Sequence, residues 1–413
     1  MKLHAITFGC QMNEADSEEM ALPLLLRGYQ TTSELSEADA VLVNTCTVRE
    51  HAEHRAVSRI GRLRAWKAAR PGRLLIVAGC AAERLGEALR RKFPFVDLVV
   101  GARSIEDYPA LLDAVLEGRP VTAAGAAPAP SGYVTVMRGC NYACAYCIVP
   151  SVRGRESHLP FERILRQARE RAERGSREIF LLGQTVNSWK DSAAGKDFSD
   201  LLRAVGTLPG VGRVRFMSPH PVFLDERLSA AMAETPAAAP HLHLPAQSGS
   251  DRILQEMRRG HTRAQYLSKV RRLREAVPGL HLTTDFIVGF PGETEEDFRQ
   301  TLSLAEECGA GSAYCSKFSP REGTLAASLE GQLEEAAKEE RLARLLAFFE
   351  ARQREVLEGF RGRRVQVLLE TPDTGRTEHN LCARLAEPRR AGELVEALVC
   401  GCTRLGLKCS AVP

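Results

Sequence analysis

Three cysteines crowd one short segment of the chain and offer its clearest chemistry. They are Cys140, Cys144 and Cys147, in the run Met-Arg-Gly-Cys-Asn-Tyr-Ala-Cys-Ala-Tyr-Cys-Ile-Val-Pro at residues 137–150. A cubane [4Fe–4S] cluster normally binds four cysteine thiolates. Three ligands would leave one iron with an open coordination position, and an open position at a metal indicates chemistry rather than scaffolding. The spacing therefore predicts a catalytic cluster on these three residues.

Two other uses of the cysteines fit the sequence less well. A structural zinc site usually needs a second Cys pair, and none lies near this segment. Disulfides are not needed, because a chain of 413 residues can bury a full core, and residues 1–10 do not read as a secretory signal. We expect the 12 cysteines to be reduced thiols or metal ligands in a cytoplasmic protein.

The spacing of Cys140, Cys144 and Cys147 resembles that of the radical S-adenosylmethionine (SAM) superfamily. The resemblance implies that the amino and carboxylate groups of SAM bind the open iron. One electron from a reductant protein would then cleave the sulfonium and release a 5′-deoxyadenosyl radical.

A second set of cysteines follows three short apolar runs in the first 118 residues. Residues 3–8, 40–43 and 74–77 read as strands, each followed by a helix-like segment, and Cys10, Cys46 and Cys80 come just after them. Alternating strands and helices predict a Rossmann-like parallel sheet, whose carboxyl edge binds ligands. The three thiols would meet at that edge, either as ligands of a second cluster or as small buried residues that close the strand ends. Their identical placement favours ligands.

The segments around these cysteines resemble the MiaB-type tRNA methylthiotransferases, a branch of the radical SAM methylthiotransferase family. The resemblance rests on Thr-Phe-Gly-Cys-Gln-Met-Asn at residues 7–13, Asn-Thr-Cys-Thr-Val-Arg-Glu at 44–50 and Ala-Gly-Cys-Ala-Ala-Glu-Arg at 78–84. It implies an auxiliary [4Fe–4S] cluster on Cys10, Cys46 and Cys80, and so two clusters in all. Between the second and third cysteines a basic stretch predicts either RNA contact or a solvated helix face. Its candidate RNA-binding residues are Arg62, Arg64, Trp66 and Lys67.

The composition of the chain and its Pro- and Gly-rich segment predict several domains. The chain has 44% hydrophobic and 26% charged residues and a net charge of +4, which are ordinary globular values. No apolar run is long enough to cross a membrane. The Pro/Ala/Gly-rich residues 119–132 read as a linker between domains at 1–118 and 133–358, and a third domain follows at 360–413.

Six strand candidates separated by helices predict a partial (β/α)6 barrel for residues 133–358. They lie at residues 133–137, 178–182, 213–217, 241–244, 282–288 and 313–318. Chemistry in such barrels occurs at the carboxyl ends of the strands. Glycine and short polar residues follow these strands, and the family resemblance makes Gln184, Ser218, Gly289 and Glu293 candidate SAM-binding residues. His220 and His243 also end strands, but we expect them to be structural.

The last part of the chain reads as a long amphipathic helix at residues 334–360 followed by short alternating strands. The strands predict a small β-barrel, and residues 375–380 resemble the TRAM domain, an RNA-binding barrel. Arg376 and His379 are its candidate RNA contacts. We expect Cys382, Cys400, Cys402 and Cys409 to be buried strand thiols rather than a metal site.

Taken together, the family resemblance implies a tRNA methylthiotransferase. Its substrate would be N6-isopentenyladenosine at position 37 of the tRNA anticodon stem-loop. The enzyme would use two SAM molecules to convert carbon 2 of this base to the 2-methylthio form. We expect the protein to be a monomer. One alternative is methylthiolation of threonylcarbamoyl-adenosine or of a ribosomal-protein aspartate. An alternative of another class is a non-catalytic iron–sulfur RNA-binding sensor.

Overall fold

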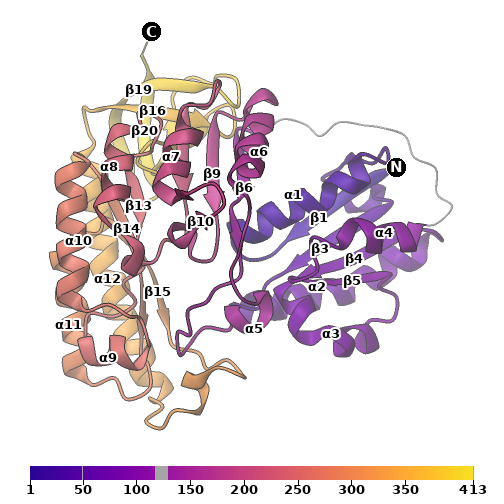
Figure 1. The fold of residues 1–413 in the computed structure, drawn as a ribbon, viewed down its shortest axis with the longest axis horizontal. Coiled ribbons are helices and arrows are strands. Elements are labelled where there is room, and N and C mark those ends of the chain that lie inside the picture. Colours follow the sequence, from indigo (N-terminus) through magenta and orange to yellow (C-terminus); the bar gives the residue numbers. More distant parts are fainter. Residues whose placement is uncertain (49, 117–128, 413) are drawn as a thin grey trace. The chain divides into compact units, whose positions relative to one another are not determined.

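The computed structural model describes residues 1–48, 50–116 and 129–412 and divides the chain into two compact units (Figure 1). The first unit combines the amino-terminal domain with two later segments, Arg138–Tyr142 and Cys147–Glu156. The second holds the central and carboxyl-terminal domains, together with Ala143–Tyr146. The loop of Cys140, Cys144 and Cys147 is therefore shared by both units, which the sequence did not indicate.

The amino-terminal domain is a five-stranded parallel sheet in the order β2-β1-β3-β4-β5. Its elements are β1 (Lys2–Thr7), α1 (Gln11–Leu25), β2 (Gln30–Thr31), β3 (Ala40–Thr45), α2 (Glu50–Ala69), β4 (Leu74–Gly79), α3 (Cys80–Lys92), β5 (Leu98–Gly101) and α4 (Tyr108–Leu116). Every residue of β3 and β4 is buried, because one apolar cluster packs α1 and α4 against the sheet and another packs α2 and α3. The predicted parallel sheet is confirmed, and β2 and β5 add edge strands that the sequence did not show.

The central domain contains six parallel strands that alternate with helices, as predicted. β6, β9 and β12 pair in parallel, β13, β14 and β15 do the same, and a bridge between Val214 and Ala238 lies between the two sets. The strands and the short pairs are β6 (Ser131–Thr135), β7 (Met137–Arg138), β8 (Ser157–His158), β9 (Glu178–Leu182), β10 (Lys190–Asp191), β11 (Lys196–Asp197), β12 (Arg213–Phe216), β13 (His241–His243), β14 (His281–Val288) and β15 (Ser312–Lys317). The helices are α5 (Val149–Arg153), α6 (Phe161–Glu173), α7 (Phe198–Gly206), α8 (Glu226–Glu234), α9 (Asp251–Glu256), α10 (Arg263–Ala276), α11 (Glu295–Glu307) and α12 (Glu335–Gly359).

The predicted linker at 119–132 lies mostly outside the described residues. Ser131 and Gly132 already belong to β6, so the first strand of the central domain begins two positions before the predicted boundary. None of the helices in the described parts of the chain has the length and apolarity that crossing a membrane requires.

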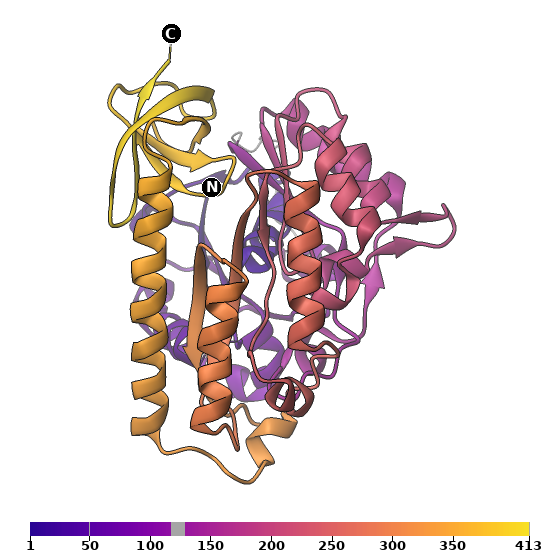
Figure 2. The ribbon, with the colours of Figure 1, turned by 90° about the vertical axis from the view of Figure 1, so that its left-hand side faces the viewer.

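The carboxyl-terminal domain is a closed five-stranded barrel, which confirms the predicted fold. Its strands are β16 (Arg364–Leu369), β17 (Thr374–Thr377), β18 (Cys382–Leu385), β19 (Leu394–Thr403) and β20 (Gly406–Ala411). In Figure 2 the long helix α12 leads to this barrel, drawn in yellow.

A buried ion-pair group joins the small barrel to the central sheet. The Glu178 carboxylate accepts hydrogen bonds from Arg213 and Arg215, whose side chains are almost fully buried. The two guanidinium groups donate onward to backbone carbonyls of the small barrel, including those of Gln366 and Glu378. Buried charges need such partners, so this junction is a fixed one.

The prediction of buried thiols in this barrel is only partly right. Cys409 is buried and Cys402 is half-buried, whereas Cys382 and Cys400 are exposed. The side chains of a strand in a closed barrel alternate between the core and solvent, and these two cysteines fall on the outer face.

Candidate functional site

The structure places Cys10, Cys46 and Cys80 at the carboxyl ends of three neighbouring strands. Cys10 caps α1 after β1, Cys46 follows β3 directly, and Cys80 is the first residue of α3 after β4. Cys46 and Cys80 are buried, and Cys10 is exposed. Burial raises the pKa of Cys80 to about 11; the Arg153 guanidinium lowers it, and the nearby thiols of Cys46 and Cys10 raise it further. The thiols of Cys46 and Cys10 thus lie near that of Cys80.

Two glycines allow this close approach. A Cβ atom on Gly9 would lie 2.7 Å from the Cys46 Cβ, and one on Gly79 would lie 2.4 Å from the Thr45 carbonyl oxygen. Both residues also have positive φ, 120° and 97°, a conformation that other residues rarely adopt. The glycines that precede Cys10 and Cys80 are therefore required by the geometry of this edge.

A buried amide pair ties the strand ends together. The Asn13 Nδ2 donates to the Asn44 Oδ1 at 2.9 Å and to the Thr45 carbonyl at 2.9 Å. In return the Asn44 Nδ2 donates to the Asn13 carbonyl at 2.8 Å and to the Ser17 Oγ at 3.0 Å. The amides fix the start of α1, which carries Cys10, against the end of β3, which carries Cys46.

We expect Asn44→Ala to lower the free energy of unfolding by about 2 to 3 kcal/mol, because several buried polar groups lose their partners. The iron content after anaerobic reconstitution should also fall, since Cys10 and Cys46 lose their common support. Urea denaturation and iron analysis measure the two effects. Gln30→Ala on the exposed edge strand β2 is the control and should change stability by less than about 0.5 kcal/mol. An unchanged iron content in Asn44→Ala would contradict the supporting role.

The donor set at this edge suits an iron–sulfur cluster. Thiolates are the normal ligands of such clusters, and helix amino termini at Cys10 and Cys80 favour negative charge on sulfur. Across the described part of the chain, no three His, Cys, Asp or Glu side chains converge on one metal ion. A cubane binds each thiolate through a different iron, so its ligands stand further apart than those of a single ion.

The thiols of Cys140, Cys144 and Cys147 are half-buried, and two of them accept hydrogen bonds. The Tyr142 amide donates to the Cys140 Sγ at 3.4 Å, and the Arg259 Nη1 donates to the Cys144 Sγ at 3.4 Å. Hydrogen bonds to sulfur favour the thiolate and tune a cluster bound there. Arg259, which is buried and also donates to the Pro245 carbonyl, was not found by sequence reasoning.

Left-handed backbone marks the carboxyl ends of three successive strands in the central domain. Ser218 after β12 has φ 61°, Gln247 after β13 has φ 76°, and Gly289 after β14 has φ 70°. Such strain in residues other than glycine gathers at binding sites. The Gln247 Oε1 and the Oε1 of Gln184, which follows β9, are buried without a hydrogen-bond partner. These oxygens could accept from amino or hydroxyl groups of SAM, which therefore fits this edge. Gln247 lies in one of the polar loops that follow the strands, although it is not among the four candidate SAM-binding residues.

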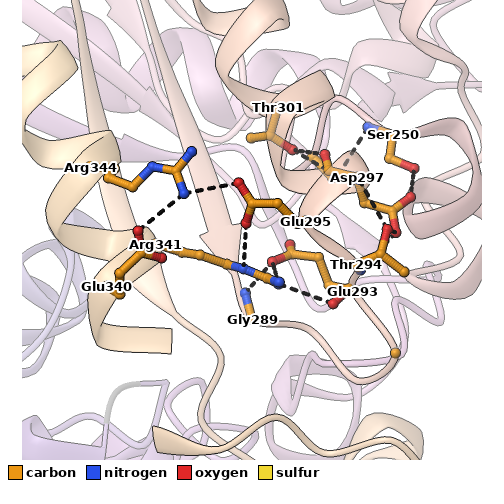
Figure 3. A network of polar contacts seen from close by, with 12 residues as sticks. Ser250, Gly289, Glu293, Thr294, Glu295, Asp297, Thr301, Glu340, Arg341 and Arg344 are labelled. Carbon is orange, nitrogen blue, oxygen red and sulfur yellow. Dashed lines mark hydrogen bonds and ion pairs between the residues drawn. The ribbon is translucent and has the colours of Figure 1, made fainter. Parts of the chain in front are cut away.

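Glu293 has a clear structural role beside Gly289 (Figure 3). Its Oε1 accepts from the Gly289 amide at 2.8 Å and from the Arg341 Nη1 at 2.6 Å, and its side chain is fully buried. Burial raises the pKa of the Glu293 carboxyl, while the Gly289 amide and Arg341 oppose that shift. Glu293 therefore positions the loop of Gly289, and its direct contact with SAM stays a prediction.

We expect Glu293→Gln to destabilise the protein by about 2 to 4 kcal/mol, because the buried Arg341 loses the nearer and more buried of its two carboxylate partners. The amide can still accept from Gly289, so the fold should survive. Glu296→Gln, three residues further on in α11 and exposed, is the matched control and should change stability by less than about 0.5 kcal/mol. Urea denaturation of both variants checks the difference, and equal stabilities would contradict it.

The two strand-end histidines are held in place by their neighbours. Burial and the charge of Arg259 lower the pKa of His220 to about 2, so its ring is neutral, and its Nδ1 accepts from the Val222 amide. The His243 ring contacts Thr283 at 3.0 Å and Asp285 at 3.1 Å. These contacts are those of structural residues.

The candidate RNA-binding residues differ in their exposure. Arg62 and Arg64 are exposed on α2, whereas the Trp66 indole is buried in the core with Arg73 over its ring at 4.8 Å. Base stacking needs an exposed ring, so we leave Trp66 out of the RNA surface proposed below. The Lys67 ammonium is bound to Asp97.

In the small barrel, Arg376 is half-buried beside Glu370, and its guanidinium donates to the Asn380 carbonyl. The His379 ring packs edge-on against Phe360, with 4.9 Å between the ring centroids. Burial lowers the pKa of His379 to about 4, so the ring is neutral at pH 7 and brings no positive charge to a phosphate.

Comparison with known proteins agrees with this architecture. Residues 134–305 match the radical SAM superfamily, and residues 2–101 match the uncharacterized protein family UPF0004. Among solved structures, the radical S-adenosylmethionine methyltransferase TsrM from Kitasatospora setae, with cobalamin and a [4Fe–4S] cluster bound, aligns over 79% of this chain and 77% of its own, with a TM-score of 0.59 and 14% identity. This likeness shows the fold alone.

Two curated relatives carry the name tRNA-2-methylthio-N(6)-dimethylallyladenosine synthase. The protein from Jannaschia sp. (strain CCS1) is 43% identical over 90% of this chain and 84% of its own length. The one from Alkalilimnicola ehrlichii is 39% identical over 96% and 94%. The chain belongs to this family of radical SAM methylthiotransferases.

Proposed function

We propose that this chain is a tRNA-2-methylthio-N6-dimethylallyladenosine synthase. It adds a methylthio group to carbon 2 of N6-isopentenyladenosine, also called N6-dimethylallyladenosine, at position 37 of the tRNA anticodon stem-loop. The observation that carries the proposal is the pair of cysteine triads, each one thiolate short of a closed cluster. One triad follows the first strand of a radical SAM barrel, and the other lies at the edge of a separate parallel sheet.

Two [4Fe–4S] clusters and two SAM molecules serve the reaction, with one electron supplied by a reductant protein. When bound, a cluster and SAM together supply the radical that activates an inert aromatic C–H bond, which side chains alone could not do. Cys140, Cys144 and Cys147 hold one cluster, and Arg259 donates to the Cys144 sulfur. Cys10, Cys46 and Cys80 would hold the other, which would supply the sulfur, and the second SAM would supply the methyl group.

The strand-end residues of the barrel bind and orient SAM. Gln184 and Gln247 offer buried amide oxygens, Ser218 and Gly289 offer backbone in left-handed turns, and Glu293 holds the Gly289 loop. Arg62 and Arg64 on α2 and Arg376 on the small barrel contact RNA phosphates, which attract arginine without regard to base sequence. The target base lies in a loop, where RNA bases are unstacked and can be reached. The protein works as a monomer.

Nucleoside mass spectrometry of tRNA tests the proposal. A bacterial strain that lacks its own enzyme and accumulates N6-isopentenyladenosine should regain the 2-methylthio form when it expresses this chain. The Cys140→Ala variant should not restore it. A methylthio group found instead on threonylcarbamoyl-adenosine or on a ribosomal-protein aspartate would assign the alternative substrates. Failure of the anaerobically reconstituted protein to cleave SAM under a strong reductant would favour a non-catalytic sensor.

A further inference from the structure

We propose that Arg153 is a positioning residue for the auxiliary cysteine site: its guanidinium, held by Asp16, faces Cys80 and Cys10 and stabilises the reduced, more negative state of a cluster bound there. The inference rests on the proposed function, because it requires a cluster on Cys10, Cys46 and Cys80. All of these residues, together with Asp16 and Arg153, belong to the first compact unit of the chain.

The position of Arg153 is fixed by packing. It ends the short helix α5, which follows the loop of Cys147, and α5 packs against the start of α3 (Figure 1). Val152 and Ile148 form a small apolar cluster with Cys80 and Ala102. This packing therefore places Arg153, the residue after Val152, at the edge of the sheet where the three cysteines lie.

Asp16 orients the guanidinium. Its carboxylate is fully buried in α1 and accepts from the Arg153 Nη2 at 2.9 Å through one oxygen. Its other oxygen accepts from the Arg138 Nη1 at 2.5 Å, and Arg138 also pairs with Glu19. One carboxylate from the helix that carries Cys10 thus holds arginines on both sides of the loop of Cys140 and Cys147.

One end of the Arg153 guanidinium has no oxygen or nitrogen partner. The Nη1 is buried and makes no hydrogen bond, although only 4% of the side chain is exposed. A buried donor without an acceptor is costly, and here the neighbouring groups are thiols. The charge of Arg153 lowers the pKa of Cys80, and Cys80 and Cys10 in turn favour the charged form of Arg153. Val152 packs against Cys80, and Asp16 lies in α1, which begins directly after Cys10, so the guanidinium is held beside the thiols that would bind the cluster.

A fixed positive charge at this place has a definite consequence. Three thiolates and a cubane carry net negative charge, and one-electron reduction makes that charge larger. Arginine stays protonated at any working pH, and both nearby charge and hydrogen bonds to sulfur set the potential of a cluster. Arg153 should therefore raise the reduction potential of the auxiliary cluster, and its removal should lower it.

The test is an EPR-monitored redox titration of the full chain in a C140A/C144A/C147A background, where only the auxiliary site can bind a cluster. At a given applied potential, the ratio of oxidised to reduced cluster in Arg153→Gln should be at least tenfold that of the parent. This ratio corresponds to a reduction potential about 59 mV lower for one electron. Arg153→Lys keeps the charge and should stay closer to the parent. Arg155→Gln removes an exposed arginine two residues away and should leave the potential unchanged.

Arg138→Gln separates charge from structure. It deprives Asp16 of a partner just as Arg153→Gln does, but Arg138 pairs with Glu19 on the other side of the carboxylate. Its potential should match the parent, and an equal shift in both variants would overturn the inference. If Arg153→Gln fails to fold, the Asp16→Asn/Arg153→Gln double variant removes the buried pair as a unit and carries the same expectation.

The two proposals fail differently. A background protein that binds no cluster would overturn the auxiliary site, and with it the inference. A cluster that forms normally but has the same potential with and without Arg153 would overturn the inference alone.

Discussion

Replacing Cys144 with alanine should abolish reductive cleavage of SAM and leave the iron of the other triad in place. A thiolate is lost from a site that has none to spare, and a cluster on two thiolates does not hold. The release of 5′-deoxyadenosine should fall to the background of the reductant alone. Because Cys10, Cys46 and Cys80 are untouched, about half of the iron should remain after reconstitution.

Chromatographic assay of 5′-deoxyadenosine, with iron analysis of the same samples, checks this result. Cys315→Ala is the matched control, since Cys315 is also half-buried but lies on β15 outside both triads. It should keep full SAM cleavage. Substantial 5′-deoxyadenosine from the Cys144 variant would show that this loop is not the site of the chemistry.

The placement of both triads could be predicted because it follows from a local repeat. Each strand of the amino-terminal sheet is parallel to the next, so a residue that comes just after a strand must lie at the same edge as its equivalents. Cys10, Cys46 and Cys80 obey that rule, and the cysteine loop after the first barrel strand obeys it too. A simple period in the sequence determines these positions without any knowledge of packing.

Trp66 was predicted to contact RNA, although the sequence contained a pattern that indicates its burial. Ile60, Leu63 and Trp66 lie at helical spacing and form the apolar stripe of α2 that packs on the sheet. The arginines of the same helix lie on its outer face. The prediction grouped Trp66 with its charged neighbours rather than with this apolar stripe, and therefore treated it as exposed to solvent.

Asp16, Arg153 and Arg259 could not be predicted in the same way. Asp16 and Arg153 are 137 positions apart in the chain, and Arg259 reaches Cys144 from 115 positions away. No repeat or local motif links such pairs, and an arginine on a helix is usually solvated. Their roles follow only from burial and from the particular carboxylate or sulfur that each one contacts.

Replacing Cys46 with alanine should separate the two halves of the reaction. Cys46 is buried beside Gly9, so alanine fills most of its space and the domain should lose only about 1 kcal/mol of stability. The loop of Cys140, Cys144 and Cys147 is unchanged. We therefore expect SAM to be cleaved to 5′-deoxyadenosine, while no 2-methylthio product forms because the sulfur-supplying site has lost a ligand.

Liquid chromatography with mass spectrometry of a reaction on isopentenylated anticodon stem-loop RNA measures both products at once. Cys382→Ala, which removes an exposed thiol of the small barrel, should form both like the parent. Methylthiolated RNA from the Cys46 variant would mean that sulfur does not come from this triad. If 5′-deoxyadenosine were lost together with the product, the two triads would depend on each other for assembly, and Cys46 would serve more than sulfur supply.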